Sequence, residues 1–120
     1  MTEQEQRDVV NGAKYQLCLQ IRARAIYANT LAGRLYALTV GKDIHKCDMC
    51  HDFAISIANQ VWDDSDDINR SIDCILSAEL IDEESYEYSI LQEARTKLCT
   101  ADATLKPIIG SREEIEGGEK

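Results

Sequence analysis

Apolar residues recur at helical spacing over the first forty residues, and few residues there would end a helix. On a helical wheel of 100° per residue they fall into two stripes. Thr2 can cap the start, and Glu5 follows three residues later as in a capping box. The pattern therefore predicts one helix over residues 3–39. Its first stripe contains Val10, Leu17, Ile21, Ala28, Leu31, Leu35 and Leu38, and its second contains Tyr15, Leu19, Ile26, Ala37 and Val40.

Two apolar stripes indicate that this helix is packed on two sides, because a surface helix needs only one. The second contact comes either from the same domain or from another copy of the chain. A helix of this length spans about 55 Å, whereas a compact domain of this size is about 35 Å across. The helix therefore either breaks, at Gly12, Asn29 or Gly33, or projects and meets a partner. Of these, we favour projection with self-association.

The remaining pattern predicts three shorter helices, at about residues 49–62, 66–81 and 83–105. Residues 63–67, Asp-Asp-Ser-Asp-Asp, are expected to form a loop that leads into a helix start, where carboxylates suit the positive end of the helix dipole. Pro107 is expected to stop the last helix. The predicted fold is thus an all-α helical bundle, with a single domain over residues 1–109 and a disordered acidic tail over residues 110–120.

Composition supports this fold class and restricts the partners. One proline and six glycines are too few for a β fold with frequent turns. The net charge is −9, which is the sum of +2 over residues 1–50 and −11 over residues 51–120. Because such a chain repels phosphate backbones, direct nucleic-acid binding is disfavoured and a protein partner with a basic surface is favoured.

Cysteine usage and hydropathy point to a compartment. The five cysteines are an odd number, and the polar, acidic N-terminus does not resemble a signal peptide. Free thiols in a reducing, cytoplasmic environment are therefore expected. No run of 18 apolar residues is present, so no membrane-spanning helix is expected.

A cluster of metal-ligating residue types lies at His45, Cys47, Cys50 and His51. Zinc prefers four such ligands, but structural sites usually draw two pairs from separated segments, so the spacing is poor. The cluster also fits the Cys-x-x-Cys-His pattern of haem attachment, without an export signal to accompany it. A thiol switch is a third interpretation, since Cys47 would lie just before a helix start, where the helix dipole lowers a thiol pKa. The simplest reading makes Cys50 a small core residue beside Phe53 and Ile57.

Other catalytic or metal-binding patterns fail. Residues 63–74 begin like a calcium-binding loop, but Ile68 and Cys74 stand where glycine and glutamate are required. His51-Asp52 resembles the His-Asp pair of metal-dependent phosphohydrolases, but only two histidines are available. No nucleophile–base pair can be assembled, so no enzymatic activity and no cofactor are expected.

These observations favour a small, acidic, non-catalytic interaction module: an adaptor, inhibitor or regulatory subunit that binds a protein surface. A basic nucleic-acid-binding cleft is one such surface, because dense carboxylates resemble phosphate charge. A metal-binding or thiol redox-sensing protein is the alternative. Arg24 lies inside an apolar stripe and should find a carboxylate or an interface. The candidate interface residues are Arg24, Tyr27, Leu31, Leu35, Asp63, Asp64, Asp66, Asp67 and Tyr88.

Overall fold

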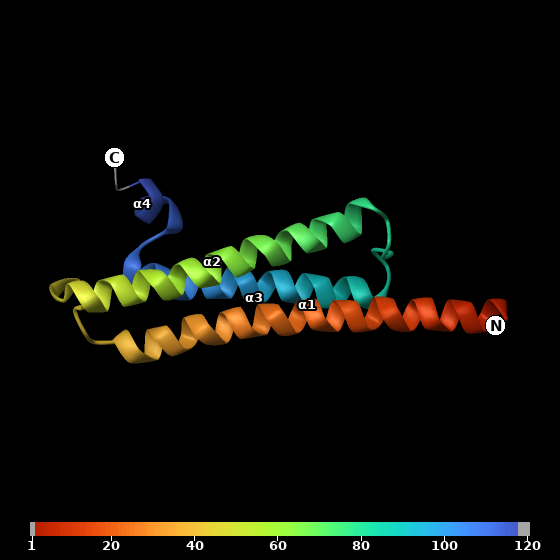
Figure 1. Ribbon diagram of the computed structural model, residues 1–120, viewed down its shortest axis with the longest axis horizontal. Coiled ribbons are helices and arrows are strands. Elements are labelled where there is room, and N and C mark those ends of the chain that lie inside the picture. The colour runs from red at the N-terminus through yellow and green to blue at the C-terminus, as the bar shows by residue number, and fades with distance from the viewer. Residues whose placement is uncertain (1, 118–120) are drawn as a thin grey trace.

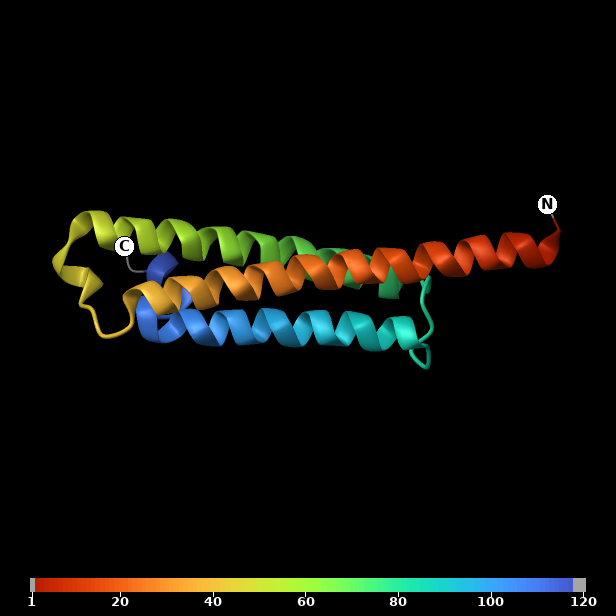
Figure 2. The same ribbon diagram turned by 90° about the horizontal axis from the view of Figure 1, so that it is seen from below.

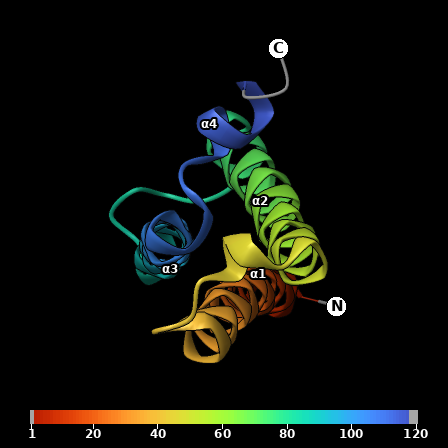
Figure 3. The ribbon, with the colours of Figure 1, turned by 90° about the vertical axis from the view of Figure 1, so that its left-hand side faces the viewer.

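The computed structural model describes residues 2–117, which contain helices and no strand. Three long helices, α1, α2 and α3, run alternately up and down beside one another (Figures 1 and 2). Seen end-on, they form a triangle, and a short helix α4 lies beside α2 (Figure 3). The fold is therefore all-α. In chain order the elements are α1 (Glu3–Thr39), the 3₁₀ turn η1 (Ile44–Lys46), α2 (Asp48–Ser77), α3 (Tyr86–Ile109) and α4 (Arg112–Gly117).

The first helix has the length that the sequence predicts, and it is unbroken. The Thr2 side chain accepts a hydrogen bond from the backbone N–H of Glu5, which satisfies one of the free donors at the helix start. The helix ends before Gly41, which adopts a φ of +75° that favours glycine. None of the glycines or asparagines within the helix interrupts it, because an isolated glycine costs a helix only about 1 kcal/mol.

A heptad pattern of buried residues holds the three long helices together. In each helix the buried positions alternate at intervals of three and four residues, the spacing of coiled-coil packing. In α1 this line, called here the seam, consists mostly of small side chains. Small side chains let α1 approach α2 and α3 closely. The buried seam of α1 contains Cys18, Ile21, Ala25, Ala28, Ala32 and Leu35.

The position of the seam corrects the predicted first stripe. Leu17 and Leu38, both expected inside, are 45% and 61% exposed, and Val10 is 51% exposed. The core is centred on the Cys/Ala line instead, because α1 contacts α2 on one flank and α3 on the other. Of the second stripe, Tyr15 and Leu19 pack against the core, whereas Ile26 and Val40 are exposed. Two-sided packing thus occurs within one protomer.

The first three turns of α1 extend beyond the other helices (Figure 1). Residues 2–13 are all exposed, whereas Tyr15 packs against the core and stacks on Tyr86 of α3 at 6.2 Å between ring centroids. The protein is accordingly elongated, at 65 × 29 × 22 Å. We call residues 3–13 the overhang and the part where the three helices lie side by side the body.

The predicted division at residues 63–67 is wrong, since α2 is one helix from Asp48 to Ser77 rather than two helices over 49–62 and 66–81. The buried line runs from Val61 through half-buried Ser65 to Ile68 without changing period. Aspartate lowers helix propensity by only a fraction of a kcal/mol per residue, and burial of the apolar face outweighs that cost. The helix ends instead at Ser77, with Ala78 as its C-cap, and Glu79 then takes a left-handed φ of 56°.

The C-terminal part of the chain also differs from expectation. Helix α3 begins at Tyr86, capped by Ser85, and continues through Pro107 to Ile109. Proline in the last turn removes only one backbone hydrogen bond, while Ile108 and Ile109 are buried. Where a disordered tail over 110–120 was expected, Arg112–Gly117 form α4, with Ile115 packed against the core. The rest of that tail, residues 118–120, lies outside the described residues.

Candidate protein-docking surface and thiol corner

A shallow groove between α1 and α2 brings together several residues that the sequence singled out. Its floor is apolar, formed by Leu17 and Ile21 of α1 and Ile75 of α2, and Arg24 and Arg70 flank it. The depression has a volume of about 440 Å³. At its end nearer the C-terminus of α1, a second depression is lined by Arg24, Tyr27 and Asp64. Arg24 joins the two, so this α1–α2 groove is a continuous surface of mixed charge.

The structure divides the candidate interface residues into exposed and internal ones. Arg24 and Tyr27 are exposed, and Tyr27 retains 56% of its surface. Leu35, in contrast, is 2% exposed and belongs to the core, so it is unable to contribute to a docking surface on this protomer. Leu31 and Tyr88 are half-buried and pack against the core. The internal candidates are those that the neighbouring helices cover, and the exposed ones lie outside that contact.

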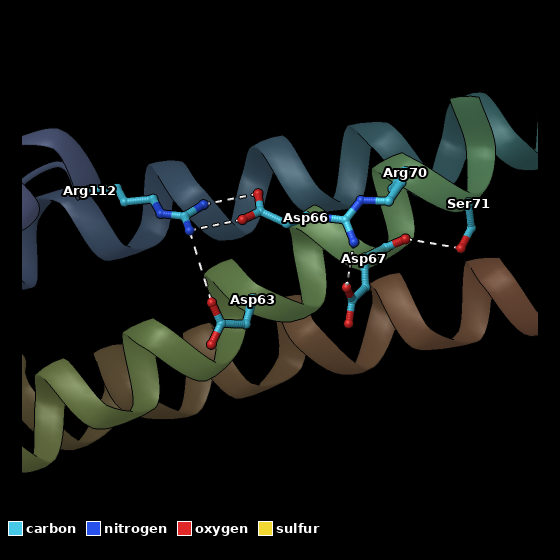
Figure 4. Close-up of polar contacts among 6 residues, drawn as sticks. All are labelled: Asp63, Asp66, Asp67, Arg70, Ser71 and Arg112. Carbon is cyan, nitrogen blue, oxygen red and sulfur yellow. Dashed lines mark hydrogen bonds and ion pairs between the residues drawn. The ribbon is translucent and has the colours of Figure 1, made fainter. Parts of the chain in front are cut away.

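The acidic run of α2 is largely engaged within the chain (Figure 4). The guanidinium of Arg112 binds both oxygens of Asp66, at 2.9 Å and 2.8 Å, and lies 4.0 Å from Asp63. Asp67 lies 3.8 Å from Arg70, one turn further along the helix. The hydrogen bond from Arg112 lowers the pKa of the Asp66 carboxyl, partly opposed by desolvation. Three of the four predicted carboxylates therefore have a cationic partner already.

Arg112 and Trp62 are structural residues that sequence reasoning missed. The Arg112 guanidinium carbon lies 6.0 Å from the centre of the Trp62 ring, within cation–π range. The Trp62 indole N–H donates to Asp102 on α3 at 3.1 Å. Together they fasten α4 to α2 and α3. The available signal was the apolar run Ile108-Ile109 followed by Ile115, which is unusual for a disordered segment.

A cross-helix ion pair joins the first helix to α3. Arg22 of α1 donates to Glu93 of α3 at 3.0 Å, and this bond raises the pKa of the guanidinium. Arg95 of α3 pairs with Asp73 of α2. These pairs connect elements that the core already joins, and because they are accessible to solvent they add little to stability.

The Cys/His cluster forms a corner where η1 meets α2. The Asp43 side chain accepts from the His45 N–H, and Cys47 is the N-cap of α2, with its Sγ accepting from the Cys50 N–H at 3.4 Å. The rings of His45 and His51 lie 5.0 Å apart between centroids. Over residues 2–117 no three His, Cys, Asp or Glu side chains are gathered in a way that could hold a metal ion.

The two thiols of this corner differ in acidity. Hydrogen bonds from the side chain and backbone N–H of Cys50 lower the pKa of Cys47, as its place before a helix predicts. The neighbouring Cys47 raises the pKa of Cys50. Both are exposed, so the interpretation of Cys50 as a core residue is wrong, and Phe53 beside it is 52% exposed. The heptad line passes through Ala54 and Ala58 instead.

Within the described residues, no helix is both long enough and apolar enough to cross a membrane. Comparison of the chain with protein-family models, curated proteins and solved structures gave no match.

Proposed function

We propose that this protein is a small, acidic, non-catalytic interaction module, an adaptor, inhibitor or regulatory subunit, and that it first associates with a second copy of itself through the α1–α2 groove. The supporting observation is the composition of that groove. Leu17 and Tyr27 are exposed large side chains, and Arg24 lies between them. Tyrosine and arginine are enriched in protein interfaces, so the groove has the chemistry of one.

Charge supports a second copy as the occupant. The groove and its rim carry both signs, with Arg24 and Arg70 beside Asp64 and Asp67. In a two-fold symmetric dimer the same patch meets itself, so cations on one copy can face carboxylates on the other. A patch of one sign would repel its own copy.

The net charge of −9 favours a further protein partner with a basic surface, of which a nucleic-acid-binding cleft is an example. Asp63 and Asp66 are poor candidates for this contact because Arg112 already occupies them. The exposed carboxylates of the α2–α3 loop are better placed: Glu79, Asp82, Glu83 and Glu84. The odd number of free cysteines favours the cytoplasm as the site of action.

Light scattering after size-exclusion chromatography tests the self-association directly. We expect twice the protomer mass for the unaltered protein, and the protomer mass for Leu17→Asp combined with Arg24→Glu. Leu38→Asp is the matched control, because Leu38 is an exposed leucine of the same helix outside the groove. It should leave the dimer intact. Raising salt from about 50 to 500 mM should weaken the dimer, because salt screens the opposite charges that face each other across it. A protomer mass for the unaltered protein at millimolar concentration would contradict self-association.

A further inference from the structure

We propose that Cys47 and Cys50 form a thiol–disulfide exchange site, in which Cys47 attacks a substrate disulfide bond and Cys50 resolves the mixed disulfide. The substrate class is an accessible disulfide, carried by a small molecule or by a protein. This proposal does not depend on the interaction function, because it uses a single protomer and a different part of the surface.

Local geometry carries the proposal. Cys47 is the N-cap of α2, with φ −126° and ψ 114°, and its sulfur accepts the N–H of Cys50 across the first turn. An N-cap side chain turns back toward the N–H groups of the first helical turn, so the Cys47 sulfur already lies beside the backbone of Cys50. A rotation of the Cys50 side chain with a small shift at the N-cap, whose backbone is extended rather than helical, brings the sulfurs to bonding distance. The pair can therefore close a disulfide while the helix remains in place.

Charge and exposure make Cys47 the attacking thiol. Backbone N–H groups at a helix N-terminus stabilise a thiolate, which is the reactive form. The hydrogen bonds that Cys47 accepts from Cys50, and its lowered pKa, agree with Cys47 being the attacking thiolate. Cys50, whose pKa is raised, stays protonated until Cys47 is consumed, as a resolving thiol requires. Neither sulfur is covered by the core.

The other three cysteines lack this arrangement. Cys18 is fully buried in the α1 seam, and burial raises its pKa. Cys74 and Cys99 are exposed but lie inside α2 and α3, away from any helix N-terminus. Cys99 is therefore an internal control of similar accessibility within the same molecule, and Cys74, which lines the α1–α2 groove, is a second control in the protomer.

The chemistry balances with the substrate disulfide as the oxidant. The Cys47 thiolate attacks one sulfur of R–S–S–R, forming a Cys47–S–S–R bond and releasing RS⁻. Cys50 then loses its proton to water and attacks the Cys47 sulfur, releasing the second RS⁻. Two electrons pass from the cysteine pair to the substrate. The products are one Cys47–Cys50 disulfide and two thiols.

The test is reaction of the reduced full-length protein with glutathione disulfide, followed by peptide mass spectrometry. We expect the peptide with residues 47–50 to lose two hydrogens. Cys50→Ser should trap glutathione on Cys47, and Cys47→Ser, which keeps a good N-cap, should abolish both products. At pH 7, Cys47 should react at least about tenfold faster than Cys74 or Cys99.

A second reaction, with insulin as the disulfide-bonded protein, distinguishes the two substrate sources. Reaction in either arm supports the exchange site and identifies its substrate. The proposal is overturned if neither arm oxidises the pair, or if Cys47 reacts no faster than Cys74 and Cys99. Cys74→Ser and Cys99→Ser should react as the unaltered protein does. Cys74 lines the α1–α2 groove and would be covered in a dimer, whereas Cys99 lies outside that groove. The comparison of Cys47 with Cys99 therefore does not depend on whether the protein forms dimers.

Discussion

The two parts of α1 share one helix and one heptad register but have different surroundings. Within the body the seam is buried from Cys18 to Leu35. Toward the N-terminus the same register continues through Lys14 and then, in the overhang, through Asn11, Arg7 and Gln4, which are all polar. Burying polar residues of this kind would not stabilise the fold, so the other helices end where the polar part of this line begins. The comparison teaches that helix formation and helix packing are decided separately in this chain.

Substituting a charge into the seam should produce the largest effect. Ile21→Asp places an unpaired carboxylate at a position that is 5% exposed. We expect it to destabilise the protein by about 3–5 kcal/mol, a large share of the stability of such a domain. Val10→Asp is the matched control in the overhang and should change stability by less than about 0.5 kcal/mol. Urea unfolding followed by circular dichroism measures both. Equal losses from the two variants would show that the overhang is packed.

Removing the arginine that fastens α4 should have an intermediate effect. Arg112→Ala removes the Asp66 pair and the cation–π contact with Trp62. Both interactions are partly exposed and screened by solvent, so we expect the free energy of unfolding to fall by about 1 kcal/mol. The pKa of Asp66 is lowered in the folded state. The stabilisation that the Asp66–Arg112 pair gives should therefore be fully present above the ordinary carboxyl pKa, roughly pH 4. It should be lost as the pH falls through the pKa that Asp66 has in the folded protein.

The pH dependence of this pair provides its own check. Unfolding of the unaltered protein and of Arg112→Ala should be compared at pH 7 and at pH 2–3. The difference between their unfolding free energies should shrink at low pH, where a protonated Asp66 no longer attracts Arg112. The exposed Arg7–Glu3 pair of the overhang, 3.6 Å apart, is the control, and Arg7→Ala should have little effect at either pH. A difference that persists undiminished in acid would mean that Asp66 is not the partner that matters.

Deleting residues 2–11 should have the smallest effect on stability. Those residues are all exposed, so the unfolding free energy should stay within about 0.5 kcal/mol. The helical signal should fall by about ten residues' worth, because the overhang is helical. A short isolated helix is marginal in water, so this segment depends on continuity with the packed part of α1. A loss of several kcal/mol on deletion would reveal an unrecognised contact.

Local signals predicted the fold class and the first helix well. Thr2, the apolar periodicity and Gly41 act within a few residues, so the bounds of α1 followed from them. The prediction of a loop at the acidic run, residues 63–67, was wrong because it also relied on local signals alone. Five consecutive polar residues resemble a loop, but Val61 and Ile68 on either side keep the heptad in phase. A continuous helix in this register is stabilised only when it packs against α1 and α3.

The candidate sites were predicted in part. Arg24, Tyr27 and Asp64 were chosen separately, and the structure brings them to one groove. Leu35 was chosen with them but is internal, because the neighbouring helices cover a face that a wheel alone cannot assign. At the corner, the position of Cys47 before a helix was predicted, and its capping bond to Cys50 follows from that position. The engagement of Asp66 by Arg112 spans 46 residues, a separation that no local pattern encodes.

The sequence by itself determined that the chain is all-α, where α1 starts and stops, and that Cys47 stands at a helix start. These properties depend on backbone hydrogen bonds, capping and side-chain periodicity, which act over a few residues. The tertiary structure decided which face of α1 is buried, that α2 is continuous, and which charges are paired. Those outcomes depend on burial between segments distant in the chain, and this free energy exists only once the helices lie together.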